Sequence, residues 1–444
     1  MMSTYMKLRE KLLVMEDMLP IISASTIGST IQWFDFYLYG VFSVTVFPAI
    51  FFPKLNPSVG MIASFGASFG GFVARPLGAV FFGWFGDRIG RRSTLVATLL
   101  LIGITTLFTG ILPGYATLGP AAPILLTLLR FAQGIGVGGE WGGSTLLAME
   151  NSDDHHRAFW TSWPQAGVPI GLVLAALTEM LCQNLYPGKA FEYIGWRIPF
   201  LLSPLMLVVG FYIRLRIPET PLFAQIQTAR EESSAPLLDT LRYYWRDVLL
   251  STLLRSGDQA PFYIFTLFLL SYGIDTLHLS STVLYTGIAL AATLEVGVLP
   301  LLGKISDHIG HKCCYLIGCI VMALAAFPYF WLLNTRNIGL IWLAIILSFV
   351  ICHALLYAPE AALIAERFGT RIRYTGASLG FQLSSITAGG PAPLIAAYLL
   401  ANKAPLLTNT PSYALIALFM IIMSFISLAV VLPLKDYTGQ PLTK

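Results

Sequence analysis

The stretch GWFGDRIGRR, residues 83–92, returns later in the chain as GKISDHIGHK, residues 303–312. The two stretches align without a gap, and both carry glycine at the first position, aspartate at the fifth and glycine at the eighth. In the first copy Asp87 stands four residues before Arg91, a spacing at which two helical side chains can pair. The match over an offset of 220 residues indicates an internal repeat about half the chain long.

A second pair of segments repeats at nearly the same offset. Residues 150–165 and 366–382 both carry Glu, Arg, Ser and Gln in that order. For the first three of these residues the offset is 216, within four of the first repeat. Two independent matches at one period predict the duplication of a single structural unit.

The composition excludes an ordinary water-soluble protein. Of the 444 residues, 56% are hydrophobic and only 11% charged, and the mean hydropathy is +0.72. About 20 apolar residues cross the roughly 30 Å hydrocarbon core of a bilayer as a helix. Twelve stretches of about this length are expected, at residues 19–48, 60–83, 95–113, 121–148, 158–183, 196–216, 247–272, 281–302, 314–333, 338–363, 374–400 and 412–433.

The predicted fold class is an all-α integral membrane protein with twelve transmembrane helices in two pseudo-symmetric six-helix bundles. Most of the 27 Lys and Arg residues fall on one side of the predicted spans, and the positive-inside rule places that side and both termini in the cytoplasm. The expected organisation is a cytoplasmic segment at 1–18, a bundle at 19–216, a cytoplasmic linker at 217–246, a second bundle at 247–433 and a cytoplasmic tail at 434–444.

Several classes of chemistry find no support in the sequence. The five cysteines show no ligand-like spacing, so we expect neither a disulfide nor a metal site. No Gly-Lys-Ser/Thr sequence occurs, which removes the ATP-binding phosphate loop and favours an ion gradient as the energy source. No nucleophile–base pair occurs at helical spacing. We therefore expect a carrier that works in the lipid bilayer without a cofactor, and neither an enzyme nor a nucleic-acid-binding protein.

Several further runs carry a family resemblance together with the stretch at 83–92. They are QWFDF at 32–36, RPLG at 75–78, RFAQG at 130–134, GGEWGG at 138–143 and RIRYTGAS at 371–378. Along its whole length the chain resembles the major facilitator superfamily and, within it, the metabolite:proton symporters, which include organic-acid, shikimate and proline/betaine permeases. The resemblance implies a monomeric protein of the bacterial inner membrane that takes up a small polar metabolite with protons.

Four positions depart from that family pattern. Gln32 stands where glutamate is usual, and Glu360 stands where glutamine is usual. In the second loop His308 and His311 replace arginines. These departures leave the number of protons and the symmetry of the gate open.

Ionisable groups inside predicted spans are the first candidates for the mechanism, because each costs roughly 2.5–3.5 kcal/mol at mid-bilayer on insertion scales. Asp35 and Arg130 lie on spans that run in opposite directions, and we assign this pair to proton coupling. A permanent salt bridge that fixes helix packing is the alternative. Glu295 is a further proton-coupling candidate, and His353 could extend its path or serve as a packing residue.

The candidate substrate ligands are arginines and glutamines in the spans. The planar guanidinium of Arg255 suits a carboxylate, although Asp258, three residues on, is expected to neutralise it. Arg75, before Pro76, is either a substrate ligand or a structural clamp. Gln165 and Gln382 occupy repeat-related positions that would face each other across a cavity. The full predicted set is Gln32, Arg75, Gln133, Gln165, Arg255 and Gln382.

The repeated loop is the candidate cytoplasmic gate. Positive charge that holds the loop inside accounts for part of its composition, but it leaves the Asp and Gly spacing unexplained. Because the second copy lacks the arginines, we expect its latch to be weaker. The predicted gate residues are Gly83, Asp87, Arg88, Gly90, Arg91, Arg92 and Asp307.

Glycines recur every fourth residue in the span at 121–148, at Gly134, Gly138 and Gly142. This period allows two helix backbones to approach closely, and we interpret it as a packing surface.

The leading functional hypothesis is proton symport of a small organic anion, because three mid-membrane arginines, Arg75, Arg130 and Arg255, offer more positive charge than a neutral-sugar site would need. Uptake of a zwitterionic osmolyte such as proline or a betaine is the close alternative, in which aromatic faces would hold the cationic end. Export of a metabolite or siderophore stays open, because helix architecture does not fix the direction of transport. A nutrient sensor that binds without transporting ranks lower.

Overall fold

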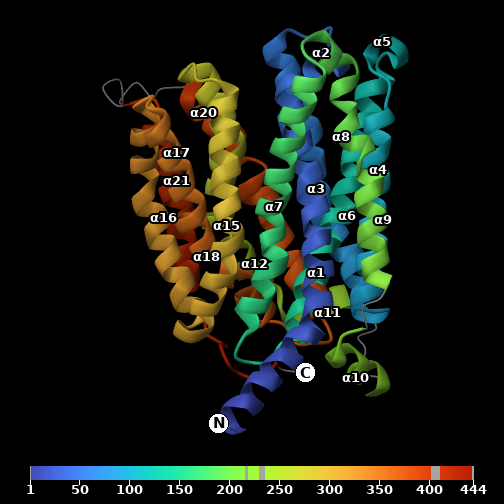
Figure 1. Ribbon diagram of the computed structural model, residues 1–444, viewed down its shortest axis with the longest axis vertical. Helices are drawn as coiled ribbons and strands as arrows, with labels where there is room; N and C mark the ends of the chain where they lie inside the picture. The colour runs from blue at the N-terminus through green and yellow to red at the C-terminus, as the bar shows by residue number, and fades with distance from the viewer. Residues whose placement is uncertain (1, 216–218, 230–235, 402–410, 443–444) are drawn as a thin grey trace.

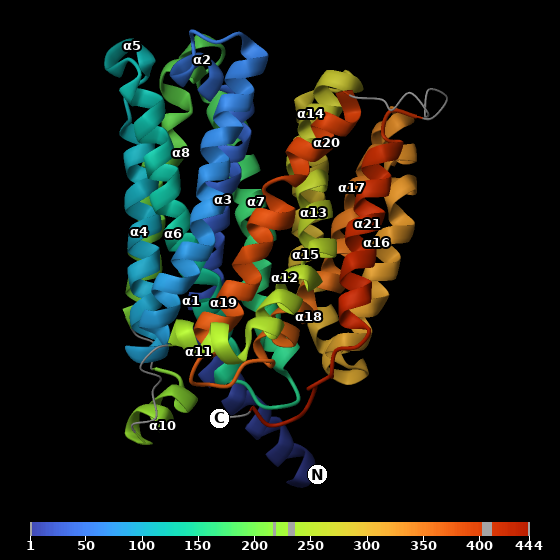
Figure 2. The ribbon, with the colours of Figure 1, turned by 180° about the vertical axis from the view of Figure 1, so that it is seen from behind.

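The computed structural model describes residues 2–215, 219–229, 236–401 and 411–442, and the described chain is helical in two side-by-side bundles (Figure 1). The bundles separate at the linker, so each corresponds to one predicted repeat. Both termini lie at the same end of the molecule (Figures 1 and 2), which is called the terminal end below.

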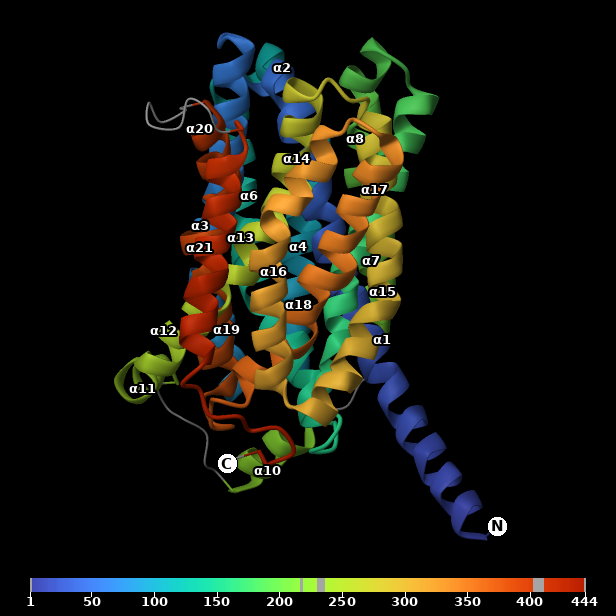
Figure 3. The ribbon, with the colours of Figure 1, turned by 90° about the vertical axis from the view of Figure 1, so that its left-hand side faces the viewer.

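The N-terminal bundle has six spans in the predicted order. They are α1 (Met2–Thr45), α3 (Pro57–Arg88), α4 (Arg91–Ile111), α6 (Ala121–Glu150), α7 (Arg157–Leu185) and the pair α8 (Arg197–Leu201) and α9 (Ser203–Leu215). Two short helices, α2 (Phe47–Phe51) and α5 (Tyr115–Leu118), and a π-helical turn, η1 (Phe191–Gly195), lie in the connections. The first turns of α1 continue through the predicted segment 1–18 and project beyond the bundle (Figure 3).

The C-terminal bundle repeats this order with more interruptions. Its spans are α12 (Trp245–Leu254) with α13 (Ser256–Tyr263) and α14 (Leu269–Ser271), α15 (Ser281–Ile309), α16 (His311–Asn334), α17 (Ile338–Leu347) with α18 (Ala354–Ala365), α19 (Arg373–Ser384) with α20 (Ala392–Ala401), and α21 (Ala414–Val431). The predicted linker contains α10 (Pro221–Ala229) and α11 (Pro236–Tyr243) at the terminal end (Figure 2).

The predicted fold class is confirmed. Within the described residues, nine helical segments are individually long and apolar enough to cross a membrane. The other three predicted spans coincide with α1, α3 and the helices between Trp245 and Ser271. Every predicted span thus has its helix.

Close packing of α3 on α6 explains the glycine period. A Cβ atom on Gly134 would lie 2.1 Å from the carbonyl oxygen of Gly71, and one on Gly138 would lie 2.0 Å from that of Arg75. Both distances are far inside van der Waals contact, so any larger side chain would force the helices apart. The packing interpretation of these glycines is confirmed.

Three spans of the C-terminal bundle are broken by π-helical turns near their middles. These turns are η2 (Ile264–Phe268), η4 (Ser348–His353) and η5 (Ser385–Gly389), and η3 (Tyr272–Thr276) ends the first of the spans. A π-helical turn shifts the phase of the side chains that follow it and often marks a functional position. Here η4 carries His353, and η5 leads into the residues that line the central pocket.

Candidate functional site

A pocket lies between the two bundles, with most of its wall from the N-terminal bundle. Its empty space is about 710 Å³, a figure that includes the solvent space open at its mouth. Helices α1, α3 and α6 contribute Gln32, Asp35, Arg75, Arg130 and Gln133 to its wall. The C-terminal bundle closes it with apolar groups. Five of the predicted site residues therefore share one cavity.

Asp35 and Arg130 form the ion pair that the sequence predicts. Arg130 Nη1 lies 3.0 Å from Asp35 Oδ2, and both side chains are buried. The side chain of Gln133 hydrogen-bonds to both partners and donates to Thr106 Oγ1 at 3.1 Å. Among the described residues, Asp35 Oδ1 and Arg130 Nε and Nη2 have no hydrogen-bond partner. The pair is thus only partly satisfied by the protein itself.

Arg75 is a buried cation in the same pocket. Its guanidinium carbon lies 4.4 Å from the ring centre of Phe72 and 5.0 Å from that of Phe36. Its Nη1 donates to the hydroxyl of Tyr263 at 3.5 Å. Within the described part of the chain, Arg75 forms no ion pair with a carboxylate. The pocket therefore carries two arginines against one aspartate, a net charge of about +1 when all three are ionised.

Arg255 forms its direct ion pair with Glu360 of α18 and not with Asp258, the partner that the sequence predicts. Arg255 Nε donates to Glu360 Oε1, and its Nη1 donates to Ser384 Oγ at 3.1 Å. Asp258 instead lies 3.4 Å from Nε2 of His353, whose Nδ1 contacts Glu295. The correct partner lay on a different helix, and the only signal in the sequence was the unusual glutamate at position 360.

The two repeat-related glutamines join the bundles. Gln165 Nε2 donates to the carbonyl of Tyr357 at 2.9 Å, and Gln382 Nε2 donates to the carbonyl of Val137 at 3.3 Å. Each bond crosses from one bundle to the other. Neither glutamine lines the central pocket in this conformation. Their role as substrate ligands, like that of Arg255, stays a prediction.

The first copy of the repeated loop holds the N-terminus of α19. Asp87 accepts hydrogen bonds from the backbone of Tyr374 at 3.2 Å and from the backbone and hydroxyl of Thr375 at 2.9 and 2.7 Å. Arg91 lies 3.4 Å from Asp87, which confirms that pair, and 3.4 Å from Glu150. A carboxylate at the first turn satisfies free N–H groups and matches the helix dipole. The loop of one bundle therefore caps a helix of the other.

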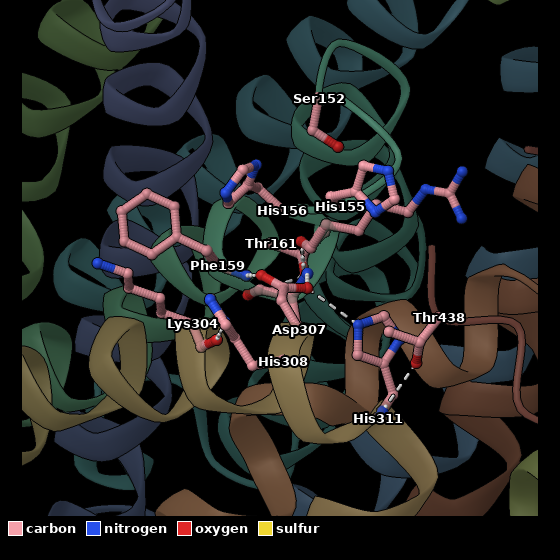
Figure 4. A network of polar contacts seen from close by, with 12 residues as sticks. Ser152, His155, His156, Phe159, Thr161, Lys304, Asp307, His308, His311 and Thr438 are labelled. Atoms are coloured by element: carbon pink, nitrogen blue, oxygen red, sulfur yellow. Dashed lines mark hydrogen bonds and ion pairs between the residues drawn. The ribbon is translucent and has the colours of Figure 1, made fainter. Parts of the chain in front are cut away.

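The second copy of the loop, in the C-terminal bundle, caps a helix of the N-terminal bundle (Figure 4). Asp307 accepts hydrogen bonds from the backbone N–H groups of Ala158 and Phe159 in the first turn of α7, both at 2.9 Å. His311 stands where the first copy has Arg91, with Nε2 3.0 Å from Asp307 and Nδ1 3.2 Å from Glu366. The expected weakening of this latch stays a prediction, but the contact pattern is retained.

Two crossed ion pairs complete this set, which is called the gate below. Arg373 lies 3.3 Å from Glu150, and Arg157 lies 2.9 Å from Glu366. All four residues belong to the second repeated segment. The predicted gate residue Arg88 is not part of this set of ion pairs. Its side chain is exposed and lies over the ring of Trp84 at 4.8 Å.

The segments that follow each bundle reinforce the gate loops. Glu219 accepts hydrogen bonds from the backbone N–H groups of Arg91 and Arg92 at 3.0 and 3.2 Å. At the corresponding place Thr438 Oγ1 accepts from the backbone N–H of His311 at 2.9 Å (Figure 4). The linker and the tail thus cap α4 and α16 in the same manner.

Gate and pocket occupy different levels of the molecule. On the span of α19 and α20, the gate contact Tyr374 precedes the pocket residue Pro393 by about five helical turns, roughly 28 Å at 1.5 Å per residue. Between these levels Trp141 and Phe381 stack across the bundles with ring centres 3.6 Å apart. The bundles are therefore joined on the terminal side of the pocket.

Residues 25–391 match the sequence profile of the Major Facilitator Superfamily. The chain belongs to this superfamily. It is 38% identical over 389 residues to the inner membrane metabolite transport protein YhjE of Escherichia coli K12, covering 86% of this chain and 88% of the relative. It is 36% identical to the shikimate transporter of the same organism, covering 84% and 86% of the two chains. It is also 32% identical to a proline/betaine transporter of Salmonella typhimurium, covering 95% and 84%.

Solved structures agree at the level of the fold. The proton:xylose symporter XylE bound to 6-bromo-6-deoxy-D-glucose superposes with a TM-score of 0.74 at 15% identity, covering 96% of this chain and 98% of that one. An inward-open conformation of XylE from E. coli gives a TM-score of 0.64 at 15% identity, covering 96% and 98%. The superfamily member described here is thus a secondary transporter of metabolites, a multi-pass inner-membrane protein and not an enzyme.

Proposed function

We propose that this protein is a proton-coupled symporter that takes up a small organic anion by alternating access, with its termini in the cytoplasm. The observation that carries the proposal is Arg75, a buried cation of the central pocket that contacts two aromatic rings and a tyrosine hydroxyl but has no carboxylate among its described contacts. A buried charge without a partner is costly. A carboxylate substrate would supply the missing counter-charge through the bidentate geometry that arginine favours.

Coupling to protons follows from the charge of the pocket. With Asp35 ionised, the pocket carries about +1, and Asp35 competes with a substrate carboxylate for Arg130. A proton on Asp35 removes that competitor and raises the pocket charge to about +2, which strengthens anion binding. Conversely, an anion on the free Nε and Nη2 of Arg130 weakens its hold on Asp35 and favours protonation. Proton and anion therefore bind together.

The same geometry ranks the alternatives. A betaine would need open aromatic faces for its quaternary ammonium group. The faces of Phe36 and Phe72 are covered by Arg75, and the ring of Tyr39 lies 3.5 Å from the guanidinium carbon of Arg130. A zwitterion would also leave the net positive charge of the pocket unbalanced. The structure gives no comparable feature for an exporter or a sensor.

The decisive experiment uses liposomes that contain the purified protein and a pH gradient with the acid side outside. A thermal-shift screen over small carboxylic acids, shikimate and glycine betaine supplies the labelled substrate. We expect a carboxylate to be accumulated in the wild type. Arg75→Gln should lower uptake at least tenfold, because it removes the cation, and Arg75→Lys should restore part of it.

Asp35→Asn tests the coupling separately. It should abolish uptake driven by the pH gradient and leave exchange of internal for external substrate, since exchange requires no net proton movement. The matched control is Arg336→Gln, which removes an exposed arginine outside the pocket and should change neither rate. Gradient-driven uptake that survives Asp35→Asn, or a preference for betaine over every carboxylate, would refute the proposal.

A further inference from the structure

The C-terminal bundle contains a second cluster of buried ionisable groups, separate from the pocket that holds Asp35. Its members are Arg255, Asp258, Glu295, His353 and Glu360, and each is at most 3% exposed. They converge from the junction of α12 and α13, from α15, and from η4 and α18. Arg255, Asp258 and His353 also line a small cavity of their own.

His353 is placed between two carboxyl groups. Its Nδ1 contacts Glu295 Oε1, and its Nε2 lies 3.4 Å from Asp258 Oδ1. A neutral imidazole has only one N–H, so one of these contacts would set a nitrogen lone pair against a carboxylate. The ring also stacks on Phe262 at 4.4 Å and on Tyr357 at 4.8 Å, and aromatic faces stabilise a cation. The geometry favours an imidazolium at this position.

A second proton follows from the pair of Asp258 and Glu360. Both belong to the buried cluster around Arg255, which forms an ion pair with Glu360 and lines one small cavity together with Asp258. Two carboxylates that share a buried site do not both ionise, and one proton between them removes the repulsion. Arg255 donates a hydrogen bond to Glu360 and so stabilises its ionised form. The shared proton is therefore carried by Asp258.

The charge count agrees with these two protons. One arginine against three ionised carboxylates and a neutral histidine would leave the cluster at −2, fully buried. An imidazolium and one protonated carboxyl group bring it to zero, the least costly charge for a site out of water. The other titratable groups that face the cluster are Tyr37, Tyr315, Tyr357 and Cys319. All four are neutral at pH 7 at their ordinary pKa values.

We propose that this cluster is a second proton-binding site, which holds one proton on His353 and another between Asp258 and Glu360. The cavity beside it is closed on the opposite side by Trp33 and Val168 of the N-terminal bundle. When the bundles separate there, water reaches His353 and Asp258 and both protons can exchange. The two-proton assignment stands independently of the proposed function, and only its use in transport rests on proton coupling.

Infrared difference spectroscopy of the full-length protein in vesicles of phosphatidylethanolamine and phosphatidylglycerol, at pH 7 and without substrate, tests the assignment. The spectrum of the wild type minus that of Asp258→Asn, and likewise minus that of Glu360→Gln, should show the C=O absorbance of one protonated carboxyl group, because the contribution of other buried carboxyl groups such as Glu179 cancels. Either variant alone tests the shared proton if the other fails to fold. Asp35→Asn is the matched control, because it removes a buried aspartate that is paired with arginine and should leave that absorbance unchanged.

His353→Gln tests the other proton. The variant removes one positive charge, so Glu295 should take up a proton and the protonated-carboxyl absorbance should rise by about as much as Asp258→Asn lowers it. An unchanged absorbance would overturn the proton on His353. A protonated-carboxyl absorbance that is undiminished in both Asp258→Asn and Glu360→Gln would overturn the shared proton. Because no substrate is present, either failure is distinct from a failure of gradient-driven uptake.

Discussion

Asp87→Asn is expected to release the gate, because the Asp87 side chain joins the first loop to α19. It accepts three hydrogen bonds from Tyr374 and Thr375 and pairs with Arg91 at 3.4 Å. Every one of the three hydrogen bonds crosses between the bundles. Asparagine keeps the shape of the side chain and one acceptor oxygen. It loses the charge, and its amide nitrogen faces N–H donors.

The magnitude follows from those contacts. Hydrogen bonds to a charged group contribute about 1.5–3 kcal/mol each, and breaking one partner of a buried ion pair costs about 3–5 kcal/mol. Arg91 keeps its contact with Glu150, which reduces the loss. A net change of about 3 kcal/mol corresponds to a roughly 100-fold shift of the equilibrium toward a state that is open at the terminal end.

Spin–spin distance measurements can detect this shift. Nitroxide labels at Ser93 and Lys304, both exposed and on different bundles, report the separation of the terminal ends in a background that lacks the five native cysteines. The ratio of long to short distances should rise about 100-fold in Asp87→Asn. The matched control is Asp153→Asn, an exposed aspartate whose hydrogen bonds go only to His155 and His156 of its own loop. A ratio that stays within twofold of the wild type would refute the capping argument.

Changes at three further residues test neighbouring contacts. His311→Arg should preserve the closed gate, because a guanidinium can bridge the same two carboxylates, whereas His311→Gln should raise the long-distance ratio about tenfold in the same assay. Gly90→Ala should lower the apparent melting temperature of the purified protein, since residue 90 has φ of 125° and a Cβ would lie 2.2 Å from Glu219. Trp141→Ala should raise the long-distance ratio about fivefold, since it removes an aromatic stack that contributes about 1 kcal/mol; a ratio equal to that of the wild type would contradict this.

The features that the sequence predicts well are local or periodic. Hydrophobic length sets each span, so all twelve coincide with helices. The i,i+4 spacing of Asp87 and Arg91 is enough to predict their pair, and the glycine period is enough to predict a packing face. The pair of Asp35 and Arg130 also follows, because the two residues lie on spans that run in opposite directions and can both approach a central cavity.

The features that the sequence does not predict depend on how each helix is rotated against its neighbours. Arg255 and Asp258 share a helical face, yet Glu360 and His353 from other helices lie closer to them. The π-helical turn η4 ends at His353 and changes the side-chain phase of the residues after it, so helical spacing alone fails there. The rotation of one bundle against the other likewise decides that Gln165 meets a backbone carbonyl and not the pocket.

The two repeats differ in the type of basic residue that makes their central contacts. In the N-terminal bundle, arginines make the central contacts, Arg91 at the gate and Arg130 in the pocket, and a guanidinium keeps its charge at any physiological pH. In the C-terminal bundle, His311 at the gate and His353 in the buried cluster each bridge two carboxyl groups. An imidazole can lose its charge near neutral pH. The duplicated frame therefore places guanidinium groups at the gate and pocket of one bundle, beside the Asp35 carboxyl group that we assign to proton coupling, and imidazole groups at the gate and buried cluster of the other.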